Sequence, residues 1–242
     1  MIKFILVILQ FSLIKSLNIK NFLSSVVVST TLLNPTTLLN PTIINTNSQL
    51  INSQPVLNSH SQSVSSITVI DNNVYFYGEI TAESCKELSG LLVELDKNSK
   101  IFTENFKTSS PPINLHIQSE GGSLMNTFYV VDLINNLETP VYTFVDGYAA
   151  SAGSLISVTG KKRYMTKNSF ILIHQLSSSM NEGKFNDLDD NMDNLNKFMN
   201  TIRRIYLEKT KITIDNLNNI LEHDLWLNSQ ESLDYGLVDY II

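Results

Sequence analysis

The sequence is poor in the residues that build disulfide-linked domains and metal sites. Among its 242 residues are one cysteine, Cys85, and four histidines. A single thiol cannot form a disulfide within the chain, and no cysteine or histidine spacing matches a metal site. The Gly-x-x-x-x-Gly-Lys-Ser/Thr pattern of a phosphate-binding loop is also missing. We therefore expect the chain to hold no metal, nucleotide or other cofactor of its own.

Acidic residues are absent before Asp71, where Lys3, Lys15 and Lys20 are the only lysines or arginines. Since these are three of 17 basic residues, residues 71–242 hold 14 against all 23 acids, a net charge of −9. A nucleic-acid-binding domain needs a basic face. The charge balance therefore argues against a nucleic-acid partner.

A long apolar run is missing as well. The apolar segment 4–14 follows Lys3, is interrupted by Gln10 and Ser12, and is too short for a stable membrane span. The next fifty residues are rich in Asn, Ser, Thr and Leu and repeat the motif Thr-Leu-Leu-Asn-Pro.

Two interpretations of this N-terminal stretch remain open. A signal-like start before a Ser-rich, acid-free segment suits delivery to an organelle stroma or matrix, with a plastid favoured, although transit peptides usually carry arginine. Biased sequence without a targeting role would instead leave the protein in the cytoplasm. In both cases we predict a disordered extension over 1–64 and a folded domain over 65–242.

The remainder alternates between strand and helix patterns. Strands are predicted over 68–80, 113–118, 141–145, 169–174 and 237–242, and helices over 84–95, 124–135, 184–209 and 214–221. This order favours an α/β layer architecture with a largely parallel sheet. The helix over 184–209 has about seven turns with apolar residues at every third or fourth position. Its apolar stripe serves either the core or another subunit.

Ser151 lies in a stretch of small residues, Gly-Tyr-Ala-Ala-Ser-Ala-Gly-Ser (147–154), between a strand and an apolar segment. A strand, a turn and a helix would place it at a helix N-terminus, where free N–H groups and the helix dipole favour developing negative charge. The stretch is not the Gly-x-Ser-x-Gly elbow, because Ala149 stands at the first glycine. Close helix packing is the alternative explanation.

Three further positions are candidates for chemistry. His174 ends an apolar strand, where α/β sheets place their active sites, although a core histidine is the alternative. Asp224 lies beside Trp226 in an apolar stretch, where a carboxylate needs a partner; a helix cap or surface ion pair is the alternative. Gly121-Gly122 follows a strand, as a plain turn or as a close approach of the backbone to a substrate.

Together these residues resemble the ClpP family, the proteolytic subunit of the Clp protease. The resemblance covers about 67–242 and rests on four motifs: Gly-Tyr-Ala-Ala-Ser-Ala-Gly (147–153), Ile-His-Gln (173–175), Asp224 ahead of Leu227 with Asp-Tyr-Gly-Leu-Val-Asp (234–239), and Ser-Glu-Gly-Gly (119–122). The order Ser, His, Asp differs from those of chymotrypsin, subtilisin and the α/β-hydrolases.

The resemblance implies a ClpP/crotonase-like α/β fold of stacked βα units with a protruding handle helix over 184–209. It implies a serine endopeptidase with Ser151 as nucleophile, His174 as general base and then acid, and Asp224 orienting the imidazole. The oxyanion hole would be the backbone N–H groups of Gly122 and Ala152.

The implied assembly is a tetradecamer of two stacked heptameric rings, built from one kind of subunit or from several. A hexameric AAA+ unfoldase would feed it unfolded polypeptide and consume the ATP. The sequence departs from the family at Glu120 and Leu176, where the family has proline. The family's axial-loop segment has no recognisable counterpart in 59–70, which weakens the expectation of unfoldase docking more than that of peptide hydrolysis.

Three alternatives remain. A crotonase-like acyl-CoA hydratase or isomerase would rely on carboxylates, so a Ser/His pair argues against it. A membrane peptidase with a Ser-Lys dyad would use Lys161, Lys162 or Lys167, yet the intact His and Asp make a lysine base unnecessary. A catalytically inactive ring subunit typically lacks a triad member, and this chain keeps all three.

Overall fold

The computed structural model describes residues 67–179 and 184–242, so the predicted extension over 1–64 lies outside the described residues. Its strands are β1 (Ile67–Ile70), β2 (Asn73–Tyr77), β3 (Ile113–Ser119), β4 (Val141–Ala150), β5 (Lys162–Met165), β6 (Phe170–Leu172), β7 (Trp226–Leu227) and β8 (Tyr240–Ile241). Its helices are α2 (Ala82–Phe106), α3 (Leu124–Asn136), α4 (Ala152–Ser157), α5 (Phe185–Lys209), α6 (Ile214–Leu221) and α7 (Ser229–Asp234).

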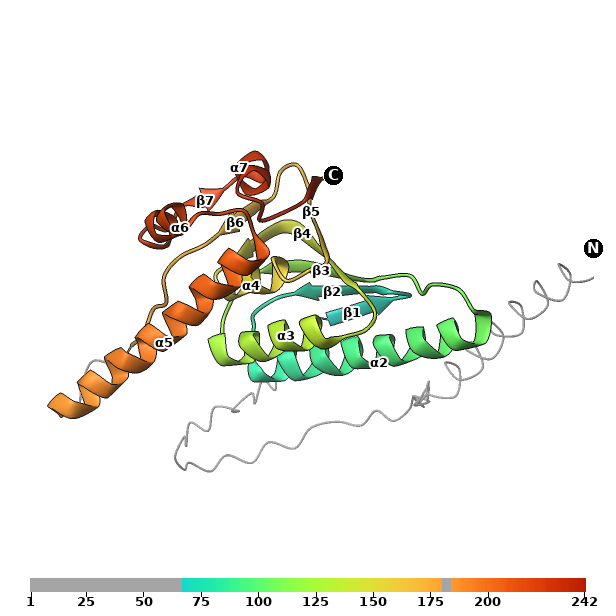
Figure 1. Ribbon diagram of the computed structural model, residues 1–242, viewed down its shortest axis with the longest axis horizontal. Coiled ribbons are helices and arrows are strands. Elements are labelled where there is room, and N and C mark those ends of the chain that lie inside the picture. Colours follow the sequence, from blue (N-terminus) through green and yellow to red (C-terminus); the bar gives the residue numbers. More distant parts are fainter. Residues whose placement is uncertain (1–66, 180–183) are drawn as a thin grey trace, which may run out of the picture. The chain divides into compact units, whose positions relative to one another are not determined.

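The strands form one eight-stranded sheet in the order β1-β2-β3-β4-β5-β8, with β6 beside β4 and β7 beside β6. The pairs from β2 to β8 along this path are parallel, and only β1–β2 and β6–β7 are antiparallel among the described strands. The predicted α/β architecture with a largely parallel sheet is thus confirmed. Helices α2 and α3 run along one face of the sheet (Figure 1).

Burial along β3 alternates, which shows how the core is built. Ile113, Leu115 and Ile117 are buried, whereas the residues between them are only partly covered. Successive side chains of a strand point to opposite faces, so the apolar set packs beneath the helices. The other face carries a row of stacked rings, one per neighbouring strand: Tyr75, His116, Phe144, Tyr164 and Tyr240.

Two predicted elements were wrong in extent. The strand predicted over 68–80 is a hairpin of β1 and β2, because Asp71 adopts φ 54° and reverses the chain. The helix predicted over 84–95 runs from Ala82 to Phe106, begins at a Thr81–Ser84 capping box and ends at Lys107 with φ 50°. Residues 101–106 are exposed, so the end of α2 has no buried stripe for the sequence to reveal.

The strand patterns also misplaced some ends. Strand β5 was not predicted, and β4 continues through Ala150, so that only Ser151 separates strand from helix. The last predicted strand is shortened to Tyr240–Ile241.

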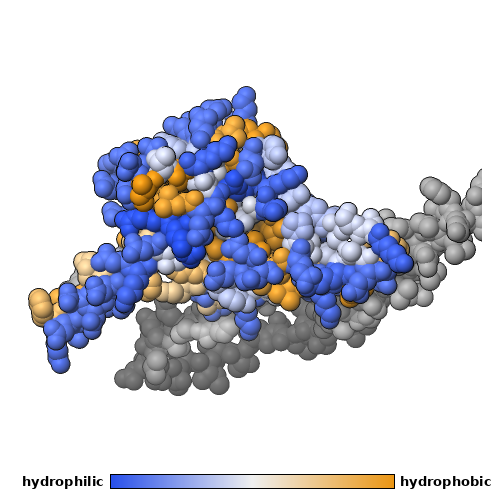
Figure 2. All heavy atoms as spheres, viewed as in Figure 1, coloured by the Kyte–Doolittle hydropathy of each residue, from blue (hydrophilic) through white to orange (hydrophobic). Residues whose placement is uncertain are grey.

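Helix α5 matches its prediction to within one residue and extends away from the sheet (Figure 1). Only Ile202, Ile205 and Tyr206, near its C-terminal end, are buried. Phe185 and Met192 in the first half are exposed apolar residues. Figure 2 shows a mainly hydrophilic visible face on this helix with hydrophobic residues at its end. The apolar stripe therefore serves the core only near the sheet.

Candidate active site

Ser151 occupies the single-residue junction between β4 and α4 and is partly exposed. Its backbone has φ 53° and ψ −123°, and its side chain makes no capping hydrogen bond to α4. Such a conformation costs a non-glycine residue on the order of 1–3 kcal/mol and persists where the surroundings enforce it. Here the Ser151 N–H donates to the Leu172 carbonyl at 2.9 Å. The junction therefore presents a hydroxyl that has no part in capping the helix.

His174 and Asp224 are brought together by the short antiparallel pair β6–β7. Leu172 pairs with Trp226, so extending the register by two residues places His174 opposite Asp224. The Nδ1 atom of His174 lies 3.1 Å from Oδ1 of Asp224. His174 is therefore the partner that was expected for the Asp224 carboxylate.

The surroundings of Asp224 differ from the sequence prediction. Its side chain is 80 % exposed, whereas that of His174 is 26 % exposed. The apolar residues around Asp224 in the chain do not bury it, because Leu225 and Trp226 are themselves exposed. A solvent-exposed contact of this kind contributes little to stability.

The Gly121-Gly122 turn is a close approach of backbone segments. Gly122 has φ 143° and forms an isolated parallel bridge with Ile80, and a Cβ atom there would lie 2.2 Å from the Ile80 carbonyl oxygen. The bridge uses the Gly121 carbonyl and the Ser123 N–H, which leaves the Gly122 N–H outside it. A Cβ on Gly121 would lie 2.8 Å from Cβ of Ser151, so the turn is pressed against the serine.

One cavity of about 90 Å³ connects these features. It is lined by Gly122, Leu124, Ser151, Ala152, Leu155, His174, Gln175, Leu176, Ser177, Ile202 and Tyr206. Ala152 is the first residue of α4, so its N–H has no acceptor within the helix. A serine, a histidine and two residues with backbone N–H groups outside the bridge and helix hydrogen bonds thus line one cavity. Among the described residues no hydrogen bond joins the Ser151 hydroxyl to His174, and such contacts often tighten only with substrate bound.

The walls of this cavity include residues that the sequence analysis did not identify as part of a site. Leu124, Leu155 and Ile202 come from three different helices and make the walls apolar. The chain after His174 is held by α6 and α5, since the Gln175 N–H donates to the Leu221 carbonyl at 2.9 Å and the Leu176 N–H meets Met199 Sδ at 3.2 Å. Helical periodicity identified these residues only as a packing face.

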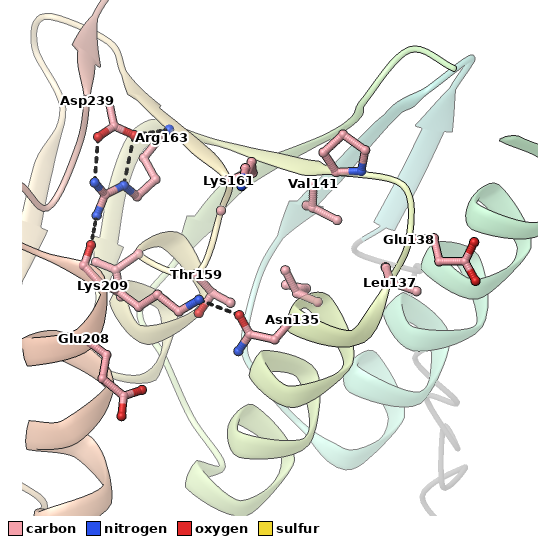
Figure 3. Close-up of a pocket in the computed structure, with 14 residues that line it drawn as sticks. Asn135, Leu137, Glu138, Val141, Thr159, Lys161, Arg163, Glu208, Lys209 and Asp239 are labelled. Carbon is pink, nitrogen blue, oxygen red and sulfur yellow. Dashed lines mark hydrogen bonds and ion pairs between the residues drawn. The ribbon is translucent and has the colours of Figure 1, made fainter. Parts of the chain in front are cut away.

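A larger cavity of about 520 Å³ lies elsewhere, between the ends of α3 and α5 (Figure 3). Two of its basic residues have partners within it: Arg163 Nη2 lies 2.6 Å from Asp239 Oδ1, and Lys209 Nζ donates to the neutral side chain of Asn135 at 2.5 Å. Burial would raise the pKa of Asp239, but Arg163 outweighs this effect and holds that pKa below its usual value. Its lining includes neither a serine nor a histidine.

The lysines of the Ser-Lys alternative lie away from Ser151. Lys161 lines the cavity of Figure 3, and the Lys162 ammonium lies 5.2 Å from the centre of the Tyr142 ring. The Lys167 N–H donates to the Ile242 carbonyl, near the far end of the sheet. None of the three lines the Ser151 cavity.

The sequence profile of the Clp protease family matches residues 58–242. The chain belongs to this family. It is 30 % identical over 165 residues to "ATP-dependent Clp protease proteolytic subunit 2" of Treponema pallidum (strain Nichols), covering 67 % of this chain and 80 % of the relative. It is 35 % identical over 150 residues to "ATP-dependent Clp protease proteolytic subunit 1" of Chlamydia pneumoniae, covering 61 % and 78 %.

Among solved structures, a point mutant of ClpP1 from Listeria monocytogenes superposes with a TM-score of 0.61 and 26 % identity. The superposition covers 71 % of this chain and 91 % of the other. The predicted family and ClpP-like fold are confirmed. The chain is a ClpP-family peptidase subunit, which implies a place in a Clp complex.

The described part of the chain offers neither a membrane-spanning helix nor a metal site. In these ranges no helix combines the length and apolar character needed to cross a bilayer. Residues 67–179 and 184–242 also contain no group of three or more His, Cys, Asp or Glu side chains arranged to hold a metal ion.

Proposed function

We propose that this ClpP-family subunit is an active serine endopeptidase that cleaves unfolded polypeptide with Ser151, His174 and Asp224. The observation that carries the proposal is the shared cavity, in which a conformationally strained serine and a carboxylate-held histidine face two unused backbone N–H groups. Strained backbone at a candidate nucleophile is a recognised mark of functional sites. The alternative is a catalytically inactive subunit of a mixed ring, in which the same arrangement of residues carries out no hydrolysis.

The residues divide the reaction as follows. Because Nδ1 of His174 faces Asp224, Nε2 is the nitrogen that takes the Ser151 proton as Oγ bonds to the substrate carbonyl carbon. The N–H groups of Gly122 and Ala152 hold the oxygen that becomes negative. His174 then returns the proton to the leaving amine as the C–N bond breaks. Water, activated by the same histidine, hydrolyses the acyl-enzyme and restores Ser151.

The proposed assembly is based on the names of the relatives, which describe them as subunits of an ATP-dependent protease. Two stacked heptameric rings, of this chain alone or mixed with others, would enclose the sites, and α5 would pack between the rings through its exposed apolar residues. A hexameric AAA+ unfoldase would deliver substrate and use the ATP, so this subunit would need no cofactor.

Labelling with a fluorophosphonate tests the proposal directly. An activated Ser151 Oγ displaces fluoride from the probe and remains covalently modified, so we expect labelling of the assembled full-length wild type and none of Ser151→Ala. His174→Ala should also lose labelling, because the hydroxyl then has no base. An assembled wild type that stays unlabelled would favour the inactive-subunit alternative.

We expect Asp224→Asn to be milder than the loss of His174. A buried triad aspartate contributes about 10⁴-fold to kcat, but Asp224 is 80 % exposed and water already screens its charge. The side-chain oxygen of the asparagine can still accept a hydrogen bond from Nδ1 of His174, so we expect kcat to fall roughly 10–100-fold. Steady-state peptide hydrolysis by Asp224→Asn and His174→Ala measures the difference. Equal losses in both would show that Asp224 is enclosed in the assembled enzyme.

A further inference from the structure

The carbonyl oxygen of Ser151 is held by a hydrogen-bonded chain that begins on α5. It accepts from the Ser154 hydroxyl at 2.6 Å and from the Ser154 N–H at 3.1 Å. The same Ser154 hydroxyl lies 2.6 Å from the Tyr206 hydroxyl. Ser154 is completely buried and Tyr206 almost so, so water does not compete for these bonds. A residue of the projecting helix therefore reaches the nucleophile turn through one intermediate.

The number of available protons sets the donor-to-acceptor direction of these hydrogen bonds. A serine hydroxyl has one proton, and that of Ser154 points to the Ser151 carbonyl, so Tyr206 must donate to Ser154. Burial raises the pKa of Tyr206 well above its ordinary value, although the bond with Ser154 lowers it somewhat. The phenol therefore keeps its proton and remains a donor. The order is Tyr206 to Ser154 to the Ser151 carbonyl.

The carbonyl so held belongs to the peptide group that carries the Ala152 N–H. A peptide group is planar and, when trans, its C=O and N–H point in opposite directions. The described chain has no cis peptide bond. Fixing the Ser151 oxygen therefore also fixes the direction of the Ala152 N–H, whose nitrogen lies against the Gly121 turn, 3.0 Å from the position of a Cβ added at Gly121. A shift of the oxygen would rotate this donor away from the position of the oxyanion.

We propose that Tyr206, acting through Ser154, is a positioning residue for the Ala152 arm of the oxyanion hole. The inference rests on the proposed peptidase function, because it concerns the stabilisation of the same tetrahedral intermediate. Preorganised donors aimed at the developing charge account for much of the catalysis at such sites. The hydrogen bond from Tyr206 to Ser154 supplies that preorganisation from α5, although Tyr206 also lines the Ser151 cavity.

The test compares Tyr206→Phe and Ser154→Ala in the full-length assembled protein. Complete loss of an oxyanion donor costs on the order of 100–1000-fold, but the Ser154 N–H still holds the carbonyl, so we expect kcat to fall about tenfold, with KM changed less than twofold. A peptide boronate that bonds to Ser151 Oγ places an oxygen in the oxyanion hole. Its inhibition constant should rise by the same factor.

Stability measurements separate positioning from packing. Each single variant leaves a buried hydroxyl short of a partner, so its thermal midpoint should fall, whereas the double variant removes both groups and should recover part of the loss. Its kcat should nevertheless stay low. Ile205→Val, a buried change on the same helix without a polar group, should lower the midpoint while kcat stays unchanged.

Two results would overturn the inference alone. One is wild-type kcat in both Tyr206→Phe and Ser154→Ala beside an inactive Ser151→Ala. The other is a kcat that follows the thermal midpoint across all variants, including Ile205→Val and the double variant. Activity that survives Ser151→Ala would instead overturn the proposed function, and the inference with it.

Discussion

Peptide turnover is expected to fall by about four to six orders of magnitude when Ser151 is replaced by alanine. In the proposed mechanism the change removes the atom that attacks the substrate carbonyl, and leaves only substrate binding and the backbone donors. The fold should persist, because alanine keeps the Cβ that already packs against Gly121, and the Ser151 N–H can still donate to Leu172. Steady-state hydrolysis of a fluorogenic peptide by the purified full-length protein measures the effect.

In the proposed mechanism Ser151 and His174 act as one unit, so combining Ser151→Ala with His174→Ala should lower kcat little more than either change alone. Ser110→Ala is a matched control, since Ser110 is partly exposed and its hydroxyl bonds only to the neighbouring Pro111 carbonyl. It should retain full turnover. Fully additive losses from the two single changes would contradict a shared step for serine and histidine.

The sequence predicted the helices that carry an apolar stripe. Apolar periodicity identified α3, α5 and α6 to within a residue or so, because their apolar positions recur every three or four residues, although only Ile202, Ile205 and Tyr206 of α5 are buried. The C-terminal end of α2 has no buried face, since residues 101–106 are all exposed. Its helical state follows from continuation of a helix already started, a cooperative effect that local patterns do not show.

The candidate site was predicted unevenly, and for physical reasons. A strand, small residues and a helix sufficed to place Ser151 at a helix start. The approach of Asp224 to His174 depends on the register of β7, a strand of only two residues that carries no alternating pattern. The sequence pattern alone left the role of Asp224 undecided, and only the family resemblance indicated that it orients the imidazole. The contact of Tyr206 with Ser154 joins positions 52 residues apart, and spacing along the chain cannot reveal it.

Gly122→Ala should damage stability and catalysis together, whereas Gly90→Ala should damage neither. At Gly122 the new methyl group would lie 2.2 Å from the Ile80 carbonyl oxygen, at a φ of 143° that L-residues rarely adopt. Strain and overpacking together should cost roughly 2–6 kcal/mol of unfolding free energy. The same displacement moves the Gly122 N–H, so the surviving folded enzyme should lose on the order of 100–1000-fold in kcat.

Gly90 provides the control because the chemical change is identical and the surroundings are not. It lies inside α2 with no atom within 4 Å of an added Cβ, so alanine there should raise the unfolding free energy by about 0.5–1 kcal/mol and leave turnover unchanged. Urea unfolding and peptide hydrolysis on the two variants give both quantities. A Gly122→Ala protein as stable and active as wild type would show that the Ile80 carbonyl can move aside. The bridge and the oxyanion hole would then tolerate a side chain at position 122, because alanine keeps the backbone N–H, and the requirement for glycine there would be refuted.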